Sequence, residues 1–140
     1  MTHISTAMPE DFAYLAAHDP HISAPILQRK IAAGEVFVAK DNGVIVGWLR
    51  YSLFWDSIPL MNMLFVDANC RSRGIGTQLV IHWEAQMSAQ GFTQVMTSTL
   101  SNETSQHFYR KLGYQDIGAL LLPNEPLEII LLKQLPNVGR

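Results

Sequence analysis

A short glycine-containing turn near the middle of the chain restricts the possible folds more than any other feature. The segment 71–77 reads Arg-Ser-Arg-Gly-Ile-Gly-Thr and lies between an apolar run, residues 60–66, and an amphipathic run, residues 75–90. The apolar run is typical of a strand and the amphipathic run of a helix. The first N–H groups of a helix have no partner within it, and glycines let an anion approach them closely. The turn therefore predicts a strand, an anion site and a helix in succession.

Two common nucleotide motifs are excluded at this turn. A P-loop requires a lysine directly after its last glycine, and no lysine follows Gly74 or Gly76. A dinucleotide fingerprint requires a small third residue, whereas this chain has Leu79 there. A plain helix start remains the alternative reading of the turn taken alone.

The hydrophobic pattern along the rest of the chain predicts a mixed α/β (α+β) domain. Asn42-Gly43 between two β-rich runs indicates a hairpin, and Ile75, Leu79 and Trp83 recur at helical spacing. The strand-helix-strand segment around the glycine turn should form a right-handed parallel crossover, with the other strands antiparallel. Strands are expected at 3–6, 36–40, 44–51, 60–66, 94–100, 114–122 and 127–133, and helices from Pro9 and over 23–34, 75–90 and 103–112.

Composition limits the class of protein. With 140 residues and 48% hydrophobic content, we expect a single domain over residues 1–140. A net charge of −2 argues against a nucleic-acid binder, and no apolar run approaches the length of a membrane span. One cysteine and five scattered histidines give little support to a disulfide framework or a metal site. No signal-peptide pattern opens the chain, so a cytoplasmic protein is the expectation.

Two motifs in order resemble the GNAT superfamily of N-acetyltransferases. The first is Leu64-Phe65-Val66 followed by Arg71-x-x-Gly74-x-Gly76, which is similar to the family's acetyl-CoA motif. The second is Asn102 followed by the run from Phe108 to Tyr114, similar to the family's Asn-x-x-Ala-x-x-Phe-Tyr-x-x-x-Gly-Phe. Two departures stand out: Ser105 replaces the usual alanine, and Ala68-Asn69-Cys70 replaces a common Pro-Glu-Tyr.

The resemblance implies a fold and a co-substrate. The fold is a mostly antiparallel sheet of six to seven strands flanked by about four helices, with a splay between the fourth and fifth strands. The co-substrate is acetyl-CoA, whose pantetheine arm would pair with the backbone of Leu64, Phe65 and Val66. The N–H of Val66 or of a neighbouring residue would polarise the thioester carbonyl. The pyrophosphate would be held by backbone amides of Arg71, Ser72, Arg73, Gly74, Ile75, Gly76 and Thr77.

The second motif supplies two side chains. By the resemblance, Asn102 bonds the pantetheine or the following helix, with a helix N-cap as the alternative. Tyr109 is the side chain expected to take part in chemistry, because the coenzyme leaves as a thiolate and a tyrosine, with a reference pKa of about 10, is a protonated donor at neutral pH. A packing role beside Phe108 is the alternative for Tyr109.

The acceptor site is less well defined by the sequence. Neither run 60–66 nor run 94–100 contains an acid. Asp56, Asp67, Glu84 and His107 lie near in sequence but fit turn, cap or surface positions better, so we expect deprotonation through water. The predicted substrate residues are Trp48, Arg50 and Trp55, where Arg50 either recognises a carboxylate or extends from a sheet edge.

The sequence thus predicts an acetyl-CoA-dependent N-acetyltransferase acting on a primary amine, with a small molecule as the favoured acceptor. A protein lysine or N-terminal amine is the second acceptor class, and a non-catalytic CoA-binding domain is the third reading. The apolar run 127–132 either pairs across a homodimer or completes the sheet.

Overall fold

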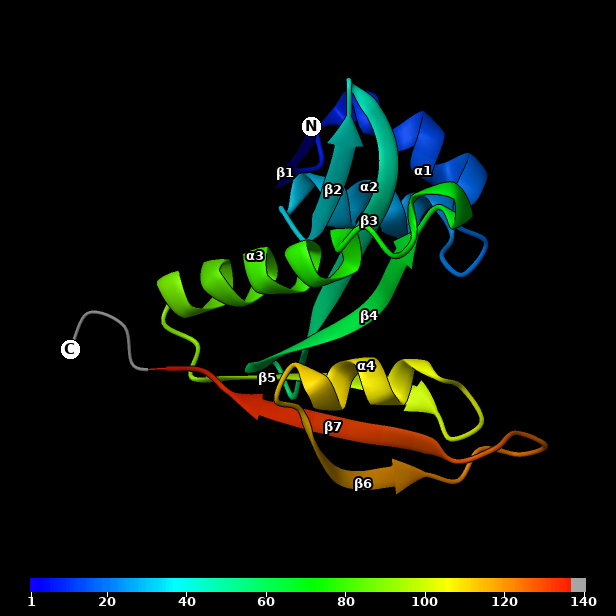
Figure 1. Ribbon diagram of the computed structural model, residues 1–140, viewed down its shortest axis with the longest axis vertical. Helices are drawn as coiled ribbons and strands as arrows, with labels where there is room; N and C mark the ends of the chain where they lie inside the picture. Colours follow the sequence, from blue (N-terminus) through cyan, green and yellow to red (C-terminus); the bar gives the residue numbers. More distant parts are fainter. Residues whose placement is uncertain (137–140) are drawn as a thin grey trace. The chain divides into compact units, whose positions relative to one another are not determined.

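A computed structural model describes residues 1–136 (Figure 1). The order of strands and helices is the one that the sequence predicts. The strands are β1 (Thr2–Thr6), β2 (Val36–Asp41), β3 (Val44–Phe54), β4 (Ile58–Val66), β5 (Gln94–Leu100), β6 (Gln115–Leu120) and β7 (Glu128–Gln134). The helices are α1 (Phe12–His18), α2 (Ala24–Ala32), α3 (Ile75–Ala89) and α4 (Ser105–Lys111).

The seven strands form one sheet in the order β1-β2-β3-β4-β5-β7-β6. Together with the four α-helices, this confirms the predicted mixed, mostly antiparallel fold. The described residues form two compact units. The first unit comprises residues 1–51 and 63–82, and the second comprises residues 52–62 and 83–136. In residues 1–136 no helix is long and apolar enough to cross a membrane.

The first unit is built on the antiparallel strands β1, β2 and β3. The hairpin between β2 and β3 turns at Asn42 and Gly43, which both have left-handed φ angles, of 52° and 80°. This confirms the Asn-Gly signal, because such turns match the twist of paired strands. Buried side chains of α1, α2 and the strands, including Leu15 and Leu27, form the core of this unit.

Gly47 on β3 allows a close approach of two backbones in the first unit. A Cβ at this position would lie 2.8 Å from the carbonyl oxygen of Phe65. The N–H of Asp67 donates to the carbonyl of Val46 at 2.8 Å, so the chain beyond β4 stays tied to β3. The end of β4 is therefore held against β3, and a 3-10 turn, Ala68–Cys70, connects it to the glycine turn.

The second unit contains β5, β7 and β6, with β6 as the outer strand (Figure 1). β4 pairs with β5 in parallel at Leu60–Met96 and Met61–Thr97, which confirms the parallel crossover through α3. β7 pairs with β5 on one side and with β6 on the other. The final strand therefore completes the sheet, and its predicted alternative, pairing across a dimer, is wrong because both its edges are already used.

Two helix starts differ from the sequence expectation. Pro9 opens a 3-10 turn, Pro9–Asp11, and α1 begins only at Phe12. The buried carboxylate of Asp11 explains this, because it accepts the N–H of Met8 at 2.8 Å and pairs with Lys40 at 2.9 Å. α4 begins at Ser105 instead of residue 103, because the carboxylate of Glu103 accepts the N–H of Leu100 at 3.1 Å in the preceding turn.

Candidate functional site

The glycine turn of the first unit leads from the end of β4 into α3. Ser72 and Gly74 adopt left-handed φ angles of 69° and 79°. α3 begins at Ile75, which is buried, while the turn before it is exposed. The amides of the first helical turn have no acceptor within the helix, so they provide donors for an anion at this exposed position.

Both arginines of the turn are engaged by groups of their own unit. Arg71 donates from Nε to the carbonyl of Val66 at 2.9 Å, and its guanidinium lies 5.7 Å from the centre of the Phe65 ring. Arg73 pairs with Asp41 at 3.1 Å, and this hydrogen bond holds the pKa of the Asp41 carboxyl below its usual range. These contacts hold the guanidinium groups of Arg71 and Arg73 at the turn. The carboxylate of Asp41 neutralises part of the positive charge of Arg73.

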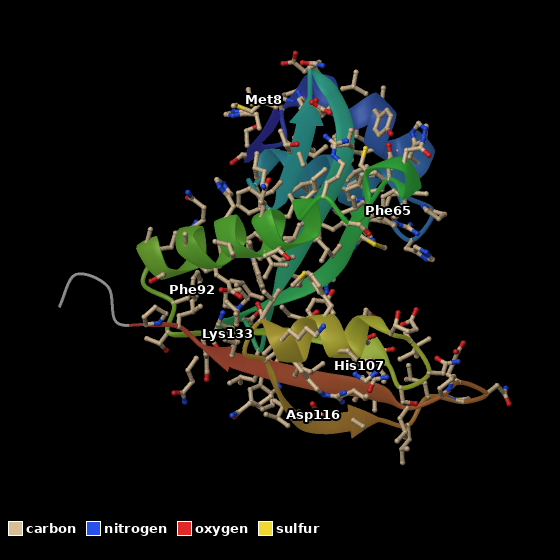
Figure 2. All side chains as sticks on the ribbon, viewed as in Figure 1. Met8, Phe65, Phe92, His107, Asp116 and Lys133 are labelled. Atoms are coloured by element: carbon tan, nitrogen blue, oxygen red, sulfur yellow. The ribbon has the colours of Figure 1, made fainter. Side chains whose placement is uncertain are left out.

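The run Leu64-Phe65-Val66 forms the end of β4, and each of the three residues is partly buried. Figure 2 labels Phe65 on this strand. Its ring packs against Trp48 of β3, with ring centroids 4.6 Å apart. Because the carbonyl of Val66 accepts Arg71, the end of the strand is held in a fixed position. The predicted oxyanion role of the Val66 N–H stays a prediction.

Tyr109 lies on α4 in the second unit and is 7% exposed. Its hydroxyl is 4.0 Å from the sulfur of Met61, and its ring packs edge-on against Phe108 at 5.3 Å. Burial raises the pKa of Tyr109 to about 12, and the charge of Glu103 adds to the rise while a hydrogen bond with Thr97 opposes it. The phenol therefore stays protonated at neutral pH, as a donor must.

The turn before α4 places Asn102 in an exposed position. The N-cap residue of α4 is Thr104, so the N-cap alternative for Asn102 is wrong. The hydroxyl of Ser105 lies 2.6 Å from that of Thr99 on β5. The departure from the family's alanine at this position therefore ties the start of α4 to the neighbouring strand.

Glu84 on α3 belongs to a partly buried polar network in the second unit. It accepts the hydroxyl of Tyr114 at 2.7 Å and the ammonium of Lys133 at 2.9 Å. Burial and the Glu84 charge raise the pKa of Tyr114. The turn, cap or surface position predicted for Glu84 from the sequence is wrong, because its side chain is only 12% exposed. Val80 and Met87 lie one helical turn to either side of Glu84 on α3 and are both buried, so the spacing of the apolar residues was a signal that Glu84 faces inward.

Arg50 on β3 lies inside the first unit and is 6% exposed. It donates from Nε to Asp19 at 2.9 Å, and the indole N–H of Trp48 donates to the same carboxylate at 3.3 Å. Burial works to raise the pKa of Asp19, but the bonds from Arg50, the His21 amide and Trp48 outweigh it and hold that pKa below its usual value. The alternative that Arg50 extends from a sheet edge is wrong, because β3 lies between β2 and β4.

Trp55, the third predicted substrate residue, occupies the turn between β3 and β4. Its side chain is 78% exposed, and it has a left-handed φ of 55°, followed by Asp56 at 58°. A positive φ is rare for a side chain as bulky as that of tryptophan. Contact of Trp48, Arg50 or Trp55 with an acceptor stays a prediction.

Comparisons with known proteins agree with the fold. The family described as Acetyltransferase (GNAT) matches residues 4–114. An uncharacterised N-acetyltransferase of Chlorobaculum tepidum is 28% identical over 91 residues, covering 65% of this chain and 56% of that protein. A probable N-acetyltransferase of Danio rerio is 32% identical over 90 residues, and the match covers 63% of this chain and 32% of the Danio rerio protein. The chain thus matches about half or less of these curated relatives.

Solved structures share the fold at low sequence identity. Ard1 from Thermoplasma volcanium superposes with a TM-score of 0.83 at 15% identity, covering 96% of this chain and 98% of that one. N-acetylglutamate synthase from Neisseria gonorrhoeae, solved with coenzyme A and N-acetyl-glutamate, gives 0.83 at 18% identity over 97% of this chain and 35% of that one. Because the family match covers most of its length and carries both motifs, this chain belongs to the GNAT acetyltransferase family.

Proposed function

We propose that the chain is an acetyl-CoA-dependent N-acetyltransferase. It transfers the acetyl group to a primary amine of a small molecule by direct attack in a ternary complex. The observation that carries the proposal is Tyr109, a buried phenol that keeps its proton at neutral pH in the second family motif. Family membership and the coenzyme A named for the Neisseria gonorrhoeae relative support the co-substrate.

The first unit contributes the phosphate and pantetheine contacts. The amides from Arg71 to Thr77 bind the pyrophosphate, with Gly74 and Gly76 leaving the backbone accessible. The backbone from Leu64 to Val66 pairs with the pantetheine arm as an added strand, next to the predicted splay. Asn102 adds a polar contact to the pantetheine.

Acyl transfer then needs two hydrogen-bond donors, one for the oxygen of the thioester carbonyl and one for the departing thiolate. The neutral amine attacks the thioester carbonyl, and the Val66 N–H stabilises the negative charge that develops on its oxygen. The carbon–sulfur bond breaks and the coenzyme leaves as a thiolate, toward which Tyr109 donates a hydrogen bond. Because the phenol, with a pKa of about 12, is a far weaker acid than a thiol of about 8.5, Tyr109 stabilises the thiolate more than it gives up its proton.

The amine loses its proton to water in this proposal. No acid lies on β4 or β5. Glu84, the one acid on α3, already accepts from Tyr114 and Lys133, so both of its oxygens have partners. A solvent route is consistent with this distribution of carboxylates.

Two features of β3 favour a small acceptor over a protein amine. The strand carries aromatic side chains, and the charge of its Arg50 is paired with that of Asp19. Asp19 pairs with Arg50 at 2.9 Å, so Arg50 is not available to bind an acidic peptide. Trp48 and Trp55 would contact the apolar part of the acceptor. A protein lysine or N-terminus is the second candidate, and a non-catalytic CoA-binding domain is the third, which the presence of Tyr109 disfavours.

The test is a panel of amines incubated with acetyl-CoA and the purified protein, with release of free thiol as the readout. We expect turnover with a subset of small primary amines. Turnover confined to peptides would replace the small acceptor with a protein amine. Binding of CoA without thiol release from any amine or peptide would contradict the enzymatic proposal.

A further inference from the structure

The carboxylate of Glu84 connects three elements of the second unit. Its side chain is 12% exposed. Oε2 accepts the hydroxyl of Tyr114, which follows α4, and Oε1 accepts the ammonium of Lys133 on β7. Figure 2 labels Lys133 on that strand. The Lys133 ammonium also lies 5.7 Å from the centre of the Tyr114 ring. The phenol of Tyr114 is therefore held at its oxygen by Glu84 and at its ring by Lys133.

Tyr114 in turn contacts Tyr109 through both ring and backbone. The two rings meet edge to face, with centroids 5.8 Å apart and planes at 64°. The N–H of Tyr114 donates to the carbonyl of Tyr109 at 3.1 Å and closes the end of α4. Tyr114 is 2% exposed, so neither ring can shift without disturbing the other.

We propose that Glu84 is a positioning residue for Tyr109, acting through Tyr114. The inference rests on the proposed function, in which the Tyr109 hydroxyl must point at the departing sulfur. A displacement of an ångström or less at a reacting group lowers turnover while leaving remote binding contacts intact. Glu84 fixes the ring that packs against Tyr109, whereas Thr97 and Met61 surround the Tyr109 hydroxyl itself.

This role differs from that of a general base in a measurable way. Loss of a base removes the enzyme-controlled limb of the pH–rate profile. Loss of a positioning contact lowers kcat by the same factor at every pH, because no proton transfer of Glu84 is involved. The occupied oxygens of Glu84 favour the second behaviour.

The experiment is a set of kinetic cycles with the full chain. Glu84→Gln keeps the shape of the side chain but removes its charge, and Tyr114→Phe removes the hydroxyl from the other side. Each is made in the wild-type and in the Tyr109→Phe background, and kcat is measured with the best amine of the panel. Affinity for CoA is measured by calorimetry, and thermal midpoints are recorded so that assays run well below them.

We expect Glu84→Gln and Tyr114→Phe each to lower kcat about fivefold, with CoA affinity unchanged and an unshifted pH profile. The double variant should lose no more than either single one, and neither change should lower kcat further in the Tyr109→Phe background. Glu125→Gln, an exposed acid of the same unit, is the matched control for charge. Val95→Ala on β5 is the control for destabilisation alone, with an unchanged kcat expected.

The failures are distinguishable. If Glu84→Gln lowers kcat by the same factor with and without the Tyr109 hydroxyl, the positioning role is overturned while the proposed function stands. If Tyr109→Phe itself retains wild-type kcat, the role of Tyr109 in the proposed function is overturned, and the positioning role with it.

Discussion

At the scale of single residues, burial keeps the hydroxyl of Tyr109 protonated, as the proposed donor role requires. A phenol near its usual pKa of about 10 is already protonated at neutral pH. Burial on α4 raises that value to about 12, so ionisation is even less favourable. A group of this kind acts by donating a hydrogen bond, and its effect depends on its direction more than on its acidity. For this reason the rings around it matter as much as the hydroxyl.

Tyr109→Phe should keep the packing of the ring and remove the donor. We expect kcat to fall roughly 100-fold or more, and acetyl-CoA affinity to change little, because the stabilised thiolate exists only late in the reaction. Steady-state kinetics with the best amine and calorimetry with CoA measure the two effects. Turnover within threefold of wild type would make Tyr109 a packing residue.

At the scale of elements, the glycine turn and the start of α3 form the coenzyme's proposed anion site. The turn supplies backbone amides for the anion. Its two arginines, Arg71 and Arg73, already donate hydrogen bonds to Val66 and Asp41. The turn is thus shaped by its own contacts before any ligand arrives. Backbone geometry should therefore contribute more to binding than either guanidinium.

Gly76→Val places a branched side chain where a phosphate must approach the amides, and CoA affinity should drop at least tenfold. Arg71→Ala should lower the affinity for CoA less, because it removes an exposed charge that already donates a hydrogen bond to the carbonyl of Val66. Calorimetric titration with CoA compares the two, with circular dichroism as the check on folding. Unchanged affinity in a folded Gly76→Val variant would remove the pyrophosphate assignment from this turn.

At the scale of the whole chain, the order of strands and helices could be predicted because hydrophobic period and turn residues are local signals. Asn42-Gly43 and the spacing of Ile75, Leu79 and Trp83 are examples. The hydrogen-bond partners of Arg50 and Glu84 could not be predicted from the sequence. Asp19 is 31 positions from Arg50. Tyr114 and Lys133 are 30 and 49 positions from Glu84. Side-chain pairing over such separations depends on tertiary packing, which no local pattern encodes.

The distribution of acids over the whole chain predicts the pH dependence of the reaction. With no acid on β4 or β5, kcat/KM should rise with pH toward the pKa of the acceptor amine. An α-amine near 8 should therefore outperform a lysine-like amine near 10.4 at neutral pH.

Alanine at Asp56 or Asp67 should lower the rate less than tenfold. pH–rate profiles with amines of different pKa provide the measurement. A plateau at an enzyme pKa near 6 to 7 for every amine, with a hundredfold loss at one acid, would reveal a dedicated base.

The placement of the three tryptophans makes the chain its own fluorescent reporter. Trp48 is 2% exposed in the first unit and Trp83 is fully buried in the second, whereas Trp55 is 78% exposed. A soluble quencher such as iodide will therefore act on Trp55 and spare the other two. In a Trp55→Phe background, removing Trp48 or Trp83 in turn leaves one buried emitter in a known unit. The emission of each single-tryptophan protein during denaturation then shows whether the two units melt together or one after the other.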